Sequence, residues 1–186
     1  GLGHRGGTRG EGGRVAGGAG VWAPDARVRQ GSEVGAVICA ASPDLAPAAR
    51  KLDALRDVTG TVESIPMISA SIMSKKIAEG SDALILDVKT GSGAFMKTAS
   101  DSRRLAESLV SLGNASGVKT EAIITAMDAP LGRAVGNSLE VIECFDVLKG
   151  KGPADLVDVS VELTARMLVL GGEASDRSDA GRQARA

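Results

Sequence analysis

Residues 82–88 (DALILDV) and residues 119–125 (KTEAIIT) decide the fold of this chain, because each is a short, nearly continuous apolar run of strand length. Residues 98–112 between them have a helical pattern, and Thr98 with Asp101 three residues later is a capping signal for that helix. A strand, a helix and a strand at this spacing predict a βαβ unit with a right-handed crossover. The predicted fold class is α/β, a mainly parallel central sheet with flanking helices.

The flanking sequence predicts further helices at residues 45–55, 64–79, 137–148 and 153–170. In the second of these, Gly80 is the C-terminal stop and Pro66 is tolerated in the first turn. Its predicted buried face consists of Pro66, Ala70, Met73 and Ile77, with Ile65 and Ile72 beside it. Residues 1–30 are rich in glycine and predict a flexible loop, residues 34–40 predict a strand, and residues 171–186 predict an irregular end.

The composition excludes several classes of protein. The chain has 186 residues, 43% hydrophobic and 24% charged, which is ordinary for a globular protein with a core. Aromatic residues make up only 2% and the formal net charge is −1, so neither base-stacking platforms nor a general field for polyanions are present. No apolar run is long enough to span a bilayer. We therefore expect a cytoplasmic protein that binds neither nucleic acid nor membranes.

The two cysteines, Cys39 and Cys144, are far apart, and the chain has a single histidine. A zinc site is therefore not expected, and reduced, buried thiols are the simpler interpretation.

A set of polar residues in one short helical segment is the main candidate for chemistry. Ser71 and Lys75 lie four residues apart on one helix face, opposite the apolar face, and Arg56 precedes them. Spacing alone favours a solvated helix surface for these side chains. Arg and Lys could also donate hydrogen bonds to the carbonyl oxygens of a small ligand and stabilise negative charge on it.

The sequence around this cluster closely resembles the nucleobase-binding segment of the thymidine and pyrimidine-nucleoside phosphorylases. The resemblance is carried by residues 54–96 (ALRDVTGTVESIPMISASIMSKKIAEGSDALILDVKTGSGAFM) and by residues 1–8 (GLGHRGGT). It implies that Arg56, Ser71 and Lys75 hold the carbonyls and ring N–H of the base. It also implies that Val62, Phe95 and Met96 form an apolar wall around its C5 substituent, for which ordinary core packing is the alternative.

Further roles also follow from the resemblance. His4 matches a proton donor to the base and Thr8 a phosphate ligand, and without the resemblance both would be chance residues of a Gly-rich terminus. Residues 89–93 (KTGSG) follow a strand, where ligands usually bind in α/β sheets, but they do not form a P-loop. Leu131, Ala134 and Glu143 match part of a monovalent-cation site, whose remaining ligands in the family lie upstream of Gly1.

The resemblance is close over residues 43–171 and fails over residues 9–31. It implies that residues 1–42 begin an α/β domain, that residues 43–78 belong to a helical lobe, and that residues 79–186 continue the α/β domain. It further implies an internal fragment of a homodimeric enzyme, whose phosphate loop (KHSTGG), N-terminal helical segment and C-terminal part lie outside this sequence.

The implied activity of the complete protein is reversible phosphorolysis of pyrimidine (deoxy)nucleosides to free base and (deoxy)ribose 1-phosphate, a pentosyltransferase reaction. Phosphate is the co-substrate, no organic cofactor is needed, and a monovalent cation is a candidate ligand. One alternative is a non-catalytic fragment or degenerate relative that at most binds a pyrimidine. Another is a phosphoribosyltransferase, but neither its pyrophosphate loop nor its acidic metal ligands are evident.

The expected fragment makes a direct prediction. The 186-residue chain alone should show no measurable thymidine or uridine phosphorolysis, because the phosphate loop supplies most of the donors that stabilise the attacking phosphate. Release of free base by the purified chain would be measured with and without phosphate. Phosphate-dependent release that is lost in Lys75→Ala would contradict the prediction.

Overall fold

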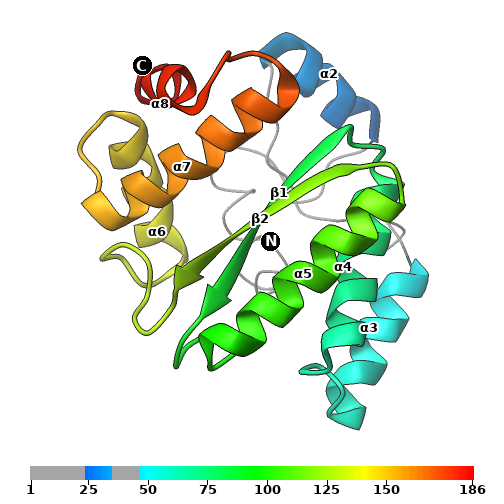
Figure 1. Ribbon diagram of the computed structural model, residues 1–186. Helices are drawn as coiled ribbons and strands as arrows, with labels where there is room; N and C mark the ends of the chain where they lie inside the picture. Colours follow the sequence, from blue (N-terminus) through cyan, green and yellow to red (C-terminus); the bar gives the residue numbers. More distant parts are fainter. Residues whose placement is uncertain (1–23, 35–46) are drawn as a thin grey trace. The chain divides into compact units, whose positions relative to one another are not determined.

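The structure is a computed structural model that describes residues 24–34 and 47–186, and within these it is a mixed α/β protein (Figure 1). The elements in chain order are α2 (Pro24–Val34), α3 (Pro47–Thr59), α4 (Ile65–Ala78), β1 (Ala83–Thr90), α5 (Ala99–Ala115), β2 (Lys119–Ala126), α6 (Asn137–Leu148), α7 (Ala154–Gly171) and α8 (Arg177–Arg185). The predicted α/β class is confirmed. The predicted strand at residues 34–40 falls outside the described residues, apart from Val34, which ends α2.

The chain divides into two compact units, which are described separately. One unit comprises Gly1–Lys51 and Arg133–Gly152, and its described elements are α2, the start of α3, and α6. The other comprises Leu52–Gly132 and Pro153–Ala186 and contains the sheet and the remaining helices. The domain boundaries that the sequence suggested after residues 42 and 78 stay a prediction.

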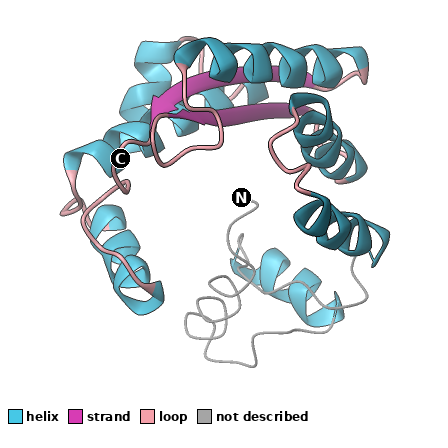
Figure 2. Cartoon of the chain, turned by 90° about the horizontal axis from the view of Figure 1, so that it is seen from below, coloured by secondary structure: helices cyan, strands magenta, loops and turns pink. Residues whose placement is uncertain are grey.

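The sheet of the second unit consists of β1 and β2, which run parallel and side by side (Figures 1 and 2). The register pairs Ala83 with Lys119 at one end and Thr90 with Ala126 at the other. Because side chains alternate along a strand, residues of even number in both strands share one face and residues of odd number share the other. The predicted strand, helix and strand are therefore present, each with ends within about three residues of the expected ones.

The even-numbered face of the sheet packs against α5 and forms the core. Val88 of β1 and Leu105, Ala106 and Leu109 of α5 are buried there, and Leu84, Leu86 and Ala122 pack around them. The predicted cap is confirmed, because the Thr98 hydroxyl accepts a hydrogen bond from the Asp101 N–H at 3.1 Å. Burying one Leu-sized side chain contributes about 1.5–3 kcal/mol, so this contact is a main source of the unit's stability.

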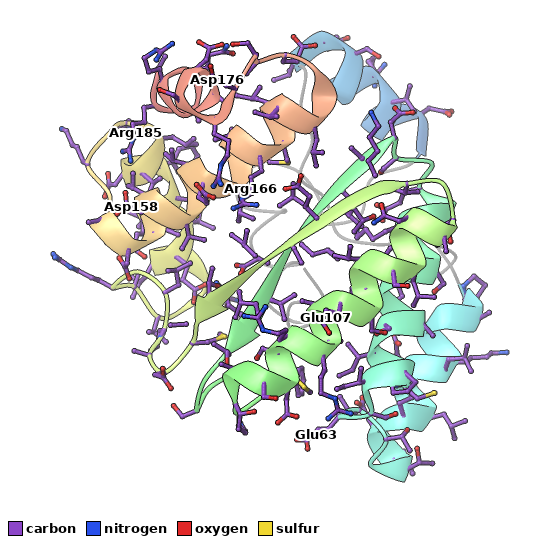
Figure 3. All side chains as sticks on the ribbon, viewed as in Figure 1. Glu63, Glu107, Asp158, Arg166, Asp176 and Arg185 are labelled. Atoms are coloured by element: carbon purple, nitrogen blue, oxygen red, sulfur yellow. The ribbon has the colours of Figure 1, made fainter. Side chains whose placement is uncertain are left out.

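The odd-numbered face of the sheet lies toward α7 and carries charged residues beside Ile85 and Ile123. Arg166 of α7 makes ion pairs with Glu121 of β2 at 3.2 Å and with Glu162 of its own helix at 2.7 Å. Helix α8 packs in turn on α7, with Ala165, Ala174 and Ala180 buried between them and Arg185 paired with Asp158 at 3.2 Å (Figure 3). The strands are therefore covered by α5 on one face and by α7 on the other, as is usual for parallel sheets.

Helix α4 packs along α5, but through a different face from the predicted one (Figure 1). Of the four residues predicted to line its buried face, only Met73 is buried, whereas Pro66, Ala70 and Ile77 are exposed. The contact face instead follows the spacing i, i+3, i+4, i+7, i+8 and consists of Ile65, Ile68, Ser69, Ile72 and Met73. The sequence misled here because Ser69 is polar. Its hydroxyl is buried without penalty because it is hydrogen-bonded to the Ser108 hydroxyl of α5 at 2.9 Å.

Three other predictions are wrong. Residues 24–30, predicted as loop, form most of α2. Residues 177–185, predicted as irregular, form α8, where the Asp176 carboxylate accepts hydrogen bonds from the N–H groups of Ser178 and Asp179. This cap satisfies N–H groups that the first turn leaves unpaired, so the short polar helix can form. Cys144 is a free thiol but is exposed, since α6 buries none of its residues. Cys39 lies outside the described residues.

A tight contact between α5 and β2 gives a first stability prediction. A Cβ added at Gly113 would lie 2.0 Å from the Thr120 hydroxyl oxygen and 2.7 Å from Thr120 Cβ. Gly113→Ala should therefore destabilise the chain by about 1–3 kcal/mol despite the better helix propensity of alanine. Gly181→Ala in α8 is the matched control, because nothing lies within 4 Å of its added Cβ. Urea unfolding should show a lower free energy of unfolding for Gly113→Ala and no decrease for Gly181→Ala. Equal stability of both would contradict the predicted clash.

The Asp176 cap gives a prediction about pH. Chiefly the hydrogen bond from the Asp179 backbone N–H lowers the pKa of Asp176 below the ordinary value of 3.8. Because the pKa is lowered in the folded state, the ionised cap stabilises the fold at pH values above 3.8. This stabilisation is lost as the pH falls through the folded-state pKa. The protection of the Ser178 and Asp179 amides against hydrogen exchange, relative to an unfolded peptide at the same pH, should fall in that acid range. In Asp176→Ser, whose hydroxyl also caps but carries no charge, the acid dependence should shrink; an unchanged profile would contradict the assignment.

Candidate functional site

Helices α3 and α4 bring three side chains of the second unit into one polar cluster. Lys75 of α4 makes an ion pair with Asp53 of α3, with 3.3 Å between Nζ and Oδ2. Ser71, one turn before Lys75, donates its hydroxyl proton to Asp53 Oδ1 at 3.4 Å and accepts from Lys75 Nζ at 3.4 Å. The side chains of Lys75 and Asp53 are 28% and 22% exposed, so the cluster is shielded but remains open to solvent.

Arg56 lies three residues after Asp53 on α3, and therefore on the same side of that helix. Its Nη2 donates a hydrogen bond to the Val62 carbonyl oxygen at 3.1 Å, which fixes the guanidinium against the turn between α3 and α4. The Arg56 Nε atom is buried and has no hydrogen-bond acceptor among the described residues. A buried unpaired donor is costly to the fold, and the described contacts therefore leave part of the hydrogen-bonding capacity of Arg56 unused.

The polar groups of Arg56, Ser71 and Lys75 match in kind those that a small planar molecule with two carbonyl groups would need. Arg56 and Lys75 have cationic side chains that donate hydrogen bonds. Ser71, which lies between these two residues in the sequence, has a hydroxyl that can donate or accept. Sequence reasoning selected these three residues but missed Asp53. Its position one helical turn before Arg56 was the available signal. The roles of Arg56, Ser71 and Lys75 as ligand contacts stay a prediction.

The predicted apolar wall is divided between different environments. Met96 is buried in the core, whereas Phe95 is 62% exposed. Both line a hollow of about 450 Å³, together with Glu63, Ile65, Pro66, Lys97, Asp101 and Arg104. None of Arg56, Ser71 and Lys75 lines this hollow, and Val62 reaches Arg56 through its carbonyl oxygen. Met96 therefore packs in the core, which was the alternative to the apolar wall. Its contact with a base stays a prediction.

A second polar cluster occupies the carboxyl end of the sheet on its odd-numbered face. Lys89 makes an ion pair with Asp87 at 2.6 Å, and both contact the Thr125 hydroxyl, Lys89 at 2.8 Å and Asp87 at 2.5 Å. The loop that follows β1 is fastened to the end of β2, because Asp128 Oδ1 accepts from the Ser92 N–H at 2.9 Å. A Cβ at Gly91 would lie 2.5 Å from that carboxylate, so a glycine is needed there. Sequence analysis placed this loop but not its anchor.

The remaining predicted residues are only partly described. His4 and Thr8 lie outside the described residues. The Glu143 carboxylate accepts hydrogen bonds from the N–H groups of Arg133 at 2.9 Å and Ala134 at 3.2 Å. Within the described residues no group of three or more His, Cys, Asp or Glu side chains could hold a metal ion. A cation site that uses the carbonyls of Leu131 and Ala134 with Glu143 stays a prediction.

Comparison with known proteins identifies the class of protein. The sequence profile of the family described as "Glycosyl transferase family, a/b domain" matches residues 16–186. The chain is 52% identical over 172 residues to the thymidine phosphorylase of Mycobacterium tuberculosis (strain CDC 1551 / Oshkosh). It is 57% identical over 139 residues to the pyrimidine-nucleoside phosphorylases of Staphylococcus aureus (strain USA300) and Staphylococcus haemolyticus (strain JCSC1435). The chain belongs to this glycosyl transferase family, and within it to the thymidine and pyrimidine-nucleoside phosphorylases.

These matches cover most of this chain but less than half of each relative. The first takes in 92% of the chain and 40% of the M. tuberculosis protein, and the others 75% of the chain and 32% of each staphylococcal protein. The family profile extends through residues 16–31, which lie in the stretch predicted to depart from the family. Among the described helices, none has the length and apolar character needed to cross a membrane.

Proposed function

We propose that this chain supplies the nucleobase-binding part of an enzyme that catalyses the reversible phosphorolysis of pyrimidine (deoxy)nucleosides. The products are the free base and (deoxy)ribose 1-phosphate. The observation that supports this proposal most directly is the convergence of Ser71 and Lys75 on one carboxylate, with Arg56 one turn away. The 52% identity to a protein named thymidine phosphorylase and the 57% identity to proteins named pyrimidine-nucleoside phosphorylase support the same reaction.

The proposed chemistry places different demands on the three base-binding residues. Phosphate attacks the sugar C1′ as the glycosidic bond breaks, and the electron pair of that bond leaves with the base. Arg56 and Lys75 stabilise the resulting negative charge on the base through its carbonyl oxygens, and Ser71 fixes the orientation of the ring. An ion pair as exposed as Lys75–Asp53 contributes only about 0–1 kcal/mol to stability, so Lys75 can engage a ligand at little cost to the fold.

Other components of the reaction remain part of the proposal. His4 would protonate the departing base and Thr8 would contact phosphate. Val62, Phe95 and Met96 would surround the C5 substituent. A monovalent cation at Leu131, Ala134 and Glu143, a homodimer, and a cytoplasmic location complete it. The proposed partners are a pyrimidine nucleoside and phosphate.

A non-catalytic pyrimidine-binding chain is the second candidate, and the two are distinguished by experiment. The sequence would be extended at both ends to the length of the relatives, and uridine and thymidine phosphorolysis would be assayed beside the 186-residue chain. Activity of the extended version supports the enzyme. Binding of uridine without turnover in the extended version would support the non-catalytic candidate, and absence of both would reject the base site.

The extended enzyme also tests Arg56. Arg56→Ala should cost about 2–4 kcal/mol of transition-state stabilisation, because it removes a charged donor next to the departing base. The measurement is kcat/KM for uridine phosphorolysis. Arg103→Ala is the matched control, since Arg103 is an exposed arginine on α5 away from the cluster. If kcat/KM of Arg56→Ala stayed within about threefold of the parent, Arg56 would have only a structural role.

A further inference from the structure

The cluster of Asp53, Ser71 and Lys75 has only one consistent arrangement of protons. An ionised carboxylate can only accept hydrogen bonds, and an ammonium group can only donate them. Ser71 therefore donates its one proton to Asp53 Oδ1 at 3.4 Å and accepts from Lys75 Nζ at 3.4 Å. A hydroxyl oxygen has two lone pairs, and Lys75 uses one of them. What Ser71 can still offer a ligand is a single acceptor.

This arrangement matters because a serine hydroxyl alone does not discriminate between donors and acceptors. Its proton rotates to suit whatever lies opposite. With the proton committed to Asp53, Ser71 offers an acceptor beside the donor of Lys75, and Arg56 of α3 supplies a further donor. Two donors and one acceptor are what a planar edge of carbonyl oxygen, ring N–H and carbonyl oxygen requires, the edge that uracil and thymine carry. Cytosine has an unprotonated ring nitrogen at the central position and an amino group at one flank.

We propose that Asp53 is a positioning residue that sets base specificity by holding Ser71 as an acceptor for the ring N3–H of a uracil-type base. The inference rests on the proposed base site and deepens it. Asp53 does not touch the base in this scheme; it acts through Ser71. The ring N–H of uridine then has a partner, whereas the ring nitrogen of cytidine meets the lone pair of Ser71. Because two acceptors cannot pair, cytidine should bind more weakly than uridine by about tenfold or more.

A purely structural role for Asp53 makes a different prediction. If the carboxylate only joined α3 to α4, its loss would weaken the binding of both nucleosides equally. Nothing about the uridine-to-cytidine ratio would change. The ratio of the two dissociation constants therefore separates specificity from stability.

The test measures the dissociation constants of uridine and cytidine for the 186-residue chain and its variants by NMR titration. The parent should prefer uridine by about tenfold or more. Asp53→Asn preserves shape but carries an amide that can donate to Ser71 Oγ and release its proton toward the ligand. The preference should then fall to about threefold or less. Asp57→Ala, which removes an exposed carboxylate one turn further along α3, is the matched control and should keep the parental ratio.

Two further variants show whether Asp53 acts through Ser71. Ser71→Ala removes the oriented hydroxyl and should lower the preference in the same way. The double variant Asp53→Asn/Ser71→Ala should then have the same ratio as Ser71→Ala alone, because both substitutions remove the same oriented acceptor. Ser71→Ala leaves Asp53 paired with Lys75, so it tests the inference even if Asp53→Asn folds poorly.

The outcomes are distinguishable. Uridine binding with an unchanged ratio in either Asp53→Asn or Ser71→Ala would overturn the role of Asp53 while leaving the base site standing. Equal affinities for the two nucleosides in the parent would overturn the role of Asp53 in the same way. Binding of neither nucleoside by the parent would overturn the base site and, with it, the inference.

Discussion

The apolar contact between α5 and the even-numbered face of the two parallel strands is the interaction on which the described site depends. Leu109 is only 2% exposed and lies in the same core cluster as Val88 of the sheet and Met73 of α4. That cluster holds α4 along α5, and α4 carries Ser71 and Lys75 on its other side. Since close-packed cores resist small displacements, the polar side chains of α4 are held in place by packing several residues away.

The polar interactions contribute little to holding the fold together, and this is why they are informative. Asp53 and Lys75 are each between a fifth and a third exposed, so their ion pair is largely screened by water. The buried Nε of Arg56 even costs stability, because within the described part of the chain no acceptor satisfies it. Side chains that do little for the fold, yet are gathered at one place, fit a role in ligand binding better than a role in stability.

The odd-numbered face of the sheet shows the same separation of packing from chemistry. Parallel strands are normally apolar on both faces, but here Asp87, Lys89 and Thr125 form a closed hydrogen-bonded group near the strand ends. The loop after β1 is anchored to Asp128 beside them. This group links the ends of β1 and β2, and so fixes the start of the loop that carries Phe95 and Met96.

The sequence by itself determined the elements whose signals are local. The apolar runs of β1 and β2, the Thr98 cap of α5 and the bounds of α6 follow from residue order, and the resemblance carried by residues 54–96 named the family. Only the tertiary structure decided which face of α4 is buried, because Ser69 becomes tolerable in the core through its bond to Ser108 of another helix. It alone also joined Asp53 to Lys75, 22 residues apart, since no local pattern shows that two helices will meet at these positions. Periodicity states which residues share a side of one helix, but the partner that covers that side is chosen by packing over the whole unit.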